Sequence, residues 1–282
     1  MLGTQPPPQP QPNNFDLVGS DSQGTHCGGI SGIKRLSPLD TKHAFSALKG
    51  DSLYNLSVAL MASAKLKLHT DYIKNLKDIK SHLSKARDNS NKAWMLGRIA
   101  LSASQMDDKA TVASTLIPLK SILKNSEVEK DAYYAWALGY IAAIDTREYE
   151  EHKTEMLSVT DHLARLNKSP SDVLWAYVID LQAAATAKDK NCFGETLEKI
   201  KTFVEKEMVT DALSVIPQED WRAWALGITL KATAMIGNIE LYKELIESTY
   251  AAVIDARNAG KMANALLAQL DMESAALLII KP

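Results

Sequence analysis

The histidines and cysteines of this chain are the residues best suited to bind a transition metal or to attack a substrate. There are six histidines and two cysteines, and they form neither an HExxH nor a CxxC motif. His26 directly precedes Cys27, but adjacent residues rarely place an imidazole and a thiol in a productive geometry. Cys192 lies far from Cys27 in the sequence. We therefore expect no metal site and no disulfide framework, and a reducing compartment, the cytoplasm.

Two further patterns could support catalysis, and neither has the residues that its chemistry needs. In the glycine-rich stretch 24–34, Ile33 separates Gly32 from Lys34, whereas a phosphate-binding loop needs glycine and lysine to be adjacent. The acidic run 148–151 falls at the expected start of a helix, where carboxylates interact favourably with the helix dipole. General acid–base catalysis would also require burial in a cleft. We expect no catalytic residue, no cofactor and no enzymatic activity.

Contact with nucleic acid is a further possibility, because basic residues gather between Lys65 and Arg87. Seven basic residues in this stretch accompany only two acidic ones, Asp71 and Asp78. Tyr72 is the only aromatic residue there that could stack on a base, and the whole chain has a net charge of −2. We interpret the stretch as a solvated helix face, so that nucleic acid is not the expected partner. A nucleic-acid-binding helical-repeat protein that uses residues 65–87 stays as an alternative.

Large aromatic residues recur along the chain within one short motif. Trp94, Trp136 and Trp224 each begin a Trp-x-Leu-Gly sequence, Trp175 begins a degenerate copy, and Tyr54 begins a more divergent one. The copies recur roughly every 40 residues, a period typical of stacked helical hairpins.

The glycine of each motif lies inside a predicted helix, where it costs roughly 1 kcal/mol relative to alanine. We expect that a second helix approaches these glycines too closely for a Cβ atom, and that each tryptophan fills the space between neighbouring hairpins. The expected structural anchors are Trp94, Gly97, Trp136, Gly139, Trp175, Trp224 and Gly227.

Positions near each tryptophan suggest a protein-binding groove. Residues three before and four after a helical tryptophan share its face of the helix. Among the residues at these positions, Arg98, Tyr133, Tyr140 and Trp221 are of the types that dominate interface energetics, and we predict that they bind protein. The alternative, that these side chains belong to the core, stays open.

The motif resembles that of the tetratricopeptide family and related α-solenoids. In that family the motif is Trp, two residues, Leu-Gly, two residues, Tyr, whereas here Leu-Gly stands one residue closer to the tryptophan. The period is also nearer to that of HEAT-type units. The resemblance covers roughly residues 51–259 and concerns architecture only. It implies surfaces that bind proteins or peptides, and it transfers no catalytic residues.

The sequence therefore predicts an all-α fold. We expect an α-solenoid of about five helix-turn-helix repeats of roughly 40 residues, with an insertion at 209–219 and a C-terminal capping helix at 261–279. The helical-repeat domain spans 40–282. Residues 1–39, rich in proline and glutamine and then in glycine and serine, form an expected disordered leader without a secretory signal. No apolar run is long enough for membrane insertion.

These features favour a non-enzymatic adaptor, or a structural subunit of a larger multi-protein assembly, that binds protein or peptide partners. Besides the nucleic-acid-binding alternative, an effector or regulator that sequesters a partner protein has the same expected sequence features.

Overall fold

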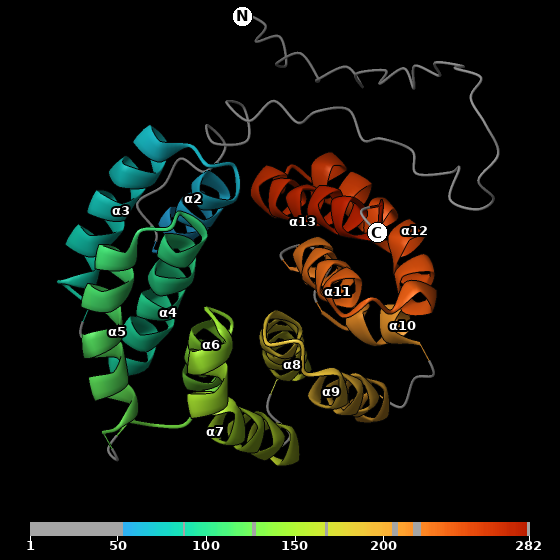
Figure 1. Cartoon of the computed structure of the whole chain (residues 1–282), viewed down its shortest axis with the longest axis horizontal. Coiled ribbons are helices and arrows are strands. Elements are labelled where there is room, and N and C mark those ends of the chain that lie inside the picture. The colour runs from blue at the N-terminus through green and yellow to red at the C-terminus, as the bar shows by residue number, and fades with distance from the viewer. Residues whose placement is uncertain are drawn as a thin grey trace, which may run out of the picture. The chain divides into compact units, whose positions relative to one another are not determined.

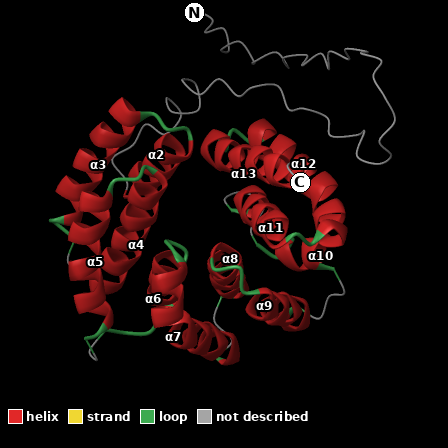
Figure 2. Ribbon diagram, viewed as in Figure 1, coloured by secondary structure: helices red, strands yellow, loops and turns green. Residues whose placement is uncertain are grey.

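The computed structural model describes residues 53–86, 88–125, 128–166, 169–204, 208–216 and 221–280. The expected leader and the domain boundary near residue 40 lie outside these residues. The described residues form helices and no strand, so the protein is all-α there (Figure 2). The helices are α2 (Leu53–Lys65), α3 (His69–Leu83), α4 (Asn89–Gln105), α5 (Lys109–Leu123), α6 (Ala132–Ala142), α7 (Thr146–Arg165), α8 (Pro170–Thr186), α9 (Lys190–Phe203), α10 (Val209–Leu213), α11 (Arg222–Ile236), α12 (Ile239–Asn258) and α13 (Met262–Ile280).

Within residues 53–280, consecutive helices pair into hairpins whose first helices lie inside and whose second helices lie outside (Figure 1). The inner helices pack in the order α2, α4, α6, α8, α11, α13, and α13 then packs against α2 as well as against α11. The inner helices therefore form a closed ring. The contact between α2 and α13 joins the first and the last of these inner helices.

Position in the hairpin determines how much of each helix is buried. In α6, an inner helix, every residue from Tyr134 to Ala142 is buried. Its partner α7 buries one face and exposes polar residues such as Glu150 and Thr154 on the other. Inner helices are mostly apolar on all sides because they lie between two inner neighbours and an outer helix, whereas outer helices need only one apolar face.

Three motif glycines lie where neighbouring inner helices come closest. A Cβ atom at Gly97 would lie 3.1 Å from the Cβ of Tyr140. At Gly139 it would lie 2.5 Å from a methyl carbon of Ile179, and at Gly227 it would lie 2.8 Å from the Cα of Ala268. This is the close helix approach that the position of the glycines predicts.

The turn between inner and outer helix has the same backbone conformation in four hairpins. Lys67, Asp107, Lys188 and Gly237 have φ angles of 56°, 58°, 62° and 79°. The N–H of the residue that follows each of them donates to a carbonyl five residues earlier, for example Asp108 to Ala103 at 2.9 Å. This is the bonding pattern of a Schellman motif, which satisfies carbonyls at a helix end. The hairpins therefore share this turn as well as the aromatic motif.

Tyrosines of the outer helices link consecutive hairpins. Tyr72 of α3 donates to the carboxylate of Asp108, which caps α5, at 3.2 Å. Tyr149 of α7 donates in the same way to Asp189, which caps α9, at 3.0 Å. Tyr242 occupies the same place in α12, but its buried hydroxyl has no hydrogen-bond partner among the described residues.

The helix starts are set by cap residues and by proline. The N-cap of α4 is Asp88, whose carboxylate accepts from the backbone N–H groups of Ser90 and Asn91. Ser169 is the N-cap of α8, and Pro170 is its first residue. The insertion contains the short helix α10, whose residues are largely buried against α9, α11 and α12.

Candidate functional site

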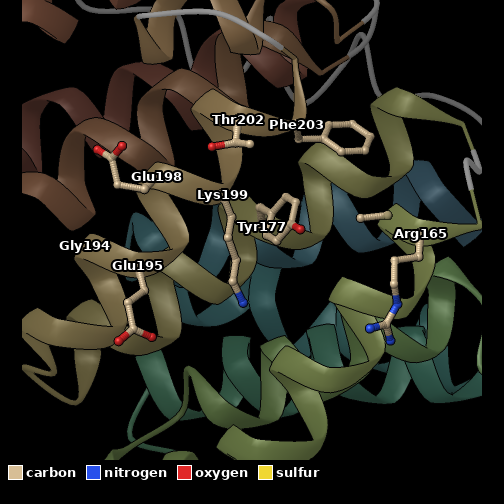
Figure 3. Close-up of a pocket in the computed structure, with 9 residues that line it drawn as sticks. Arg165, Tyr177, Gly194, Glu195, Glu198, Lys199, Thr202 and Phe203 are labelled. Atoms are coloured by element: carbon tan, nitrogen blue, oxygen red, sulfur yellow. The ribbon is translucent and has the colours of Figure 1, made fainter.

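An open groove lies between the outer helices α7 and α9, and the inner helix α8 forms its base (Figure 3). Its volume is about 850 Å³, and its lining is mostly apolar. The lining residues are Ala164, Arg165, Tyr177, Gly194, Glu195, Glu198, Lys199, Thr202 and Phe203. Three separate helices contribute to it because α8 lies inside the ring, while α7 and α9 flank it on the outside.

Two aromatic rings form the floor of the groove. Tyr177 of α8 and Phe203 of α9 pack edge to face with ring centroids 6.3 Å apart. Tyr177 is only 4% exposed, so its ring is held firmly in place. Leu166, directly after the lining residue Arg165, leaves 51% of its surface in solvent. The aromatic surface that a partner side chain could contact here is therefore mainly that of the half-buried Phe203, which the Tyr177 ring supports.

An ion pair links α7 and α9, the helices on either side of the groove. The ammonium of Lys199 on α9 lies 2.8 and 2.9 Å from the two carboxylate oxygens of Asp161 on α7. The hydroxyl of Tyr177 donates to the same carboxylate at 3.4 Å. Burial, followed by the nearby charge of Asp161, raises the pKa of Tyr177. The phenol is therefore a neutral hydrogen-bond donor at physiological pH.

The two sides of the groove carry opposite charge. Arg165 projects on one side in Figure 3, and Glu195 and Glu198 project on the other, with Tyr177 between them. Gly194 sits in the α9 wall, and a Cβ atom there would have no atom within 4 Å. No neighbouring helix requires a glycine at this position, so its missing side chain only leaves the groove wider.

Two residues of nucleophilic type lie in or beside the groove. Lys199 is neutralised by Asp161 and is not a free nucleophile. Cys192, on the same helix, is buried, and burial raises the pKa of its thiol. A reactive cysteine needs the opposite, a lowered pKa and access to solvent.

The predicted binding residue Arg98 lies in the centre of the ring, away from this groove. Its guanidinium carbon is 4.3 Å from the ring centroid of Trp94 and 5.0 Å from that of Trp224. The rings of Tyr54 and Tyr140 lie at 5.6 and 5.7 Å. Arg98 is 1% exposed and forms no ion pair within the described ranges, so aromatic faces take the place of a carboxylate.

Hydrogen bonds complete the surroundings of this cation. The guanidinium donates to the hydroxyl of Ser57 at 2.5 Å and to that of Tyr140 at 3.4 Å. Tyr140 is fully buried. Arg98 and Tyr140 each stand four residues after a motif tryptophan. The fold brings them together, but inside the core and not on an accessible surface.

The other two predicted binding residues, Tyr133 and Trp221, are half-buried at the edge of the same aromatic cluster. Tyr133 packs on Trp94 and Trp136 at centroid distances of 5.4 and 5.1 Å. Trp221 packs on Trp136 at 5.3 Å and on Trp175 at 5.2 Å. All the motif tryptophans therefore meet in one cluster, because every inner helix starts at the same end of the ring.

One group of metal-binding residue types occurs among the described residues, at Glu148, Glu151 and His152. The ammonium of Lys120 lies 2.8 Å from Glu148 and 2.9 Å from Glu151. A lysine already supplies the positive charge that this cluster needs, so we assign no metal to it.

A single buried carboxyl group and a buried ion pair lie elsewhere in the core. Asp180 of α8 is fully buried, and burial raises the pKa of its carboxyl well above the usual value. Lys65 of α2 pairs with Asp271 of α13, which also lies 3.6 Å from Lys231. Burial lowers the pKa of Lys65 to about 8, although Asp271 acts in the opposite direction.

Sequence reasoning missed the α7–α9 groove. Its residues come from three helices and share no spacing in the chain. Gly194 offered the only sequence clue, because it is the one helical glycine outside the tryptophan motif within the described ranges.

The described protein is thus all-helical, with a ring of inner helices and an open apolar groove on its outer surface. No protein-family model matches the chain, and neither does any curated protein or solved structure. Across the described ranges, no helix combines the length and apolar character that crossing a bilayer requires.

Proposed function

We propose that this chain is a non-enzymatic adaptor or structural subunit that binds another protein through the α7–α9 groove. In this proposal the five inner–outer hairpins are copies of one repeat of about 40 residues, as in α-solenoids, and α13 completes the array. The single observation that carries the proposal is the open groove with its apolar floor, about 850 Å³ in volume.

The shape of the groove favours a protein segment over a small molecule. Small-molecule sites are concave and bury most of the ligand, whereas this groove is wide open to solvent. An amphipathic segment laid along the groove could place apolar side chains on Tyr177 and Phe203. Its basic residues would face Glu195 and Glu198, and its acidic residues would face Arg165.

The cytoplasm is the compartment that we propose. Cys192, the only cysteine in the described ranges, is unpaired and buried. A free thiol of this kind is typical of proteins kept in a reducing environment.

The experiment fills the groove without disturbing the helices. In Gly194→Phe the new side chain enters open space, because nothing lies within 4 Å of the Cβ position. Tagged full-length protein is used to capture partners from its source cells, and the bound proteins are quantified by mass spectrometry. We expect partners bound by the wild type to be lost with Gly194→Phe and retained with Gly194→Ala.

A matched control places the same aromatic side chain elsewhere. Glu247 is exposed on α12, outside the groove, so Glu247→Phe should retain the partners. If Gly194→Phe binds the same partners as the wild type, or if both phenylalanine variants lose them equally, the groove is not the binding site.

A further inference from the structure

The outer helices α3 and α5 form a second surface, distinct from the groove. Tyr72 of α3 is hydrogen-bonded to Asp108 at the start of α5, so the two helices begin side by side. They are successive outer helices of the ring (Figure 1). We call this surface the α3–α5 face, defined by Ile73, Lys74, Lys77, Ile117 and Pro118.

The α5 part of this face is uncharged over three turns. Its exposed residues between Lys109 and Lys124 are Ala110, Ala113, Ser114, Ile117, Pro118 and Ser121. Ile117 is 74% exposed, and Ile73 on α3 is 64% exposed. Outer helices need a polar outer face to remain soluble, and the corresponding face of α7 or α9 carries several charges. Exposed isoleucines beside small neutral residues indicate a surface that another molecule covers.

The α3 part of the face carries two exposed lysines. Lys74 and Lys77 lie three residues apart on one side of the helix and form no ion pair with any described residue. Asp71 and Asp78, on the same helix, stand three and four residues from Lys74.

Several lysines of the other outer helices pair with carboxylates. Lys120 of α5 pairs with Glu148 and Glu151, Lys199 of α9 with Asp161, and Lys243 of α12 with Glu240. Lys74 and Lys77 form no such pair with a described residue and leave positive charge available for a partner.

We propose that the α3–α5 face binds an acidic amphipathic segment of another protein. The apolar side of the segment would cover Ile117, Pro118 and Ile73, and its carboxylates would meet Lys74 and Lys77. Charge complementarity selects an acidic partner. The uncharged α5 face selects a protein over nucleic acid, because a phosphate backbone gains nothing from exposed isoleucines and the exposed part of the face offers no aromatic ring for base stacking.

The test measures binding of defined probes to the full-length protein by fluorescence anisotropy. The first probe is a labelled amphipathic peptide of about 18 residues, with leucines on one side and glutamates on the other. The second carries lysine in place of each glutamate, and the third is a single-stranded RNA of the same length. We expect the acidic peptide to bind most tightly, with affinity that falls as salt is added.

Three variants assign the binding to this face. Lys74→Glu with Lys77→Glu should weaken binding of the acidic peptide roughly tenfold or more. Ile117→Gln, which removes apolar surface without changing charge, should weaken it roughly tenfold. Lys190→Glu with Lys243→Glu reverses the same number of charges on α9 and α12 and should leave binding within about twofold.

Several outcomes overturn the proposal. Equal or tighter binding of the RNA, or an Ile117→Gln variant that binds the peptide normally, would show a purely electrostatic surface. Failure of the acidic peptide to bind better than its lysine counterpart also contradicts it. Gly194→Phe should bind the acidic peptide like the wild type, so the outcome does not depend on the groove.

Discussion

Asp180 shows how a single buried group can couple stability to pH. Burial is the largest cause of its raised pKa, the charge of Asp161 adds to it, and Thr160 and Lys199 act in the opposite direction without offsetting it. Because the folded pKa lies above the unfolded value, the folded state binds the proton more tightly. Stability is therefore highest below about pH 4 with respect to this group and falls as the pH rises towards the folded pKa.

Replacing Asp180 with asparagine should remove this dependence, because an amide does not ionise. We expect Asp180→Asn to raise the melting temperature at pH 8 and to change it much less at pH 4. Thermal unfolding followed by circular dichroism at both values tests this. Asp255→Asn, at an exposed site on α12, should show no such difference. A variant that is destabilised equally at both pH values would mean that Asp180 stays ionised in the fold.

At the scale of helices, the motif glycines allow close packing, and at Gly227 the nearest atom belongs to the backbone of the neighbouring helix. A Cβ there would lie 2.8 Å from the backbone of Ala268, so α13 would have to move. We expect Gly227→Ala to lower the free energy of unfolding by about 2 kcal/mol. Gly194→Ala, where nothing lies within 4 Å, should raise it by about 0.5–1 kcal/mol. Urea unfolding measures both, and equal effects would contradict the role of close approach.

Hydrogen bonds from tyrosine hydroxyls to cap carboxylates join consecutive outer helices, and their contribution to stability can be tested. Removing the hydroxyl in Tyr72→Phe or Tyr149→Phe should cost about 1–2 kcal/mol, because each bonds an acidic cap. Tyr242→Phe removes a buried hydroxyl without a partner among the described residues, so it should be neutral or slightly stabilising. The same denaturant experiment compares the three variants, and a large loss with Tyr242→Phe would show that its hydroxyl is satisfied by water.

Much of this helical organisation could be predicted from the sequence, because it depends on local spacing. The apolar period, the Trp-x-Leu-Gly motif and the turn at Gly237 and Asn238 identify the hairpins. Cap positions were less predictable, since Ser90 and Asp88 are both good caps and only the backbone decides between them. The groove and the central position of Arg98 could not be predicted, because both depend on how non-adjacent helices meet.

At the scale of the whole described fold, the contact between α2 and α13 closes the ring, and Asp271 holds a charge pair across it. Its carboxylate forms ion pairs with two ammonium groups, those of Lys65 and Lys231. Asp271→Asn would leave two buried or half-buried cations without a counter-charge, so we expect a loss of about 3 kcal/mol at pH 6. The loss should shrink by pH 9, because Lys65 can release its proton.

Lys65→Met is the matched control for this pair. It removes one cation and leaves Asp271 with Lys231, so stability should change by less than about 1 kcal/mol. Hydrogen exchange of α2 and α13 gives a local measurement, and faster exchange in both helices is expected for Asp271→Asn alone. If both variants behave alike, the charge pair does not hold the two helices together.

Ring closure also decides how this kind of protein can change in length. An unclosed array of hairpins has two terminal faces that must be made polar, and it can gain a unit at either one. Here α2 and α13 cover each other, so neither terminal face needs a polar cap. A hairpin added at either end of this array would have to separate these two helices, and closure therefore constrains the number of inner helices.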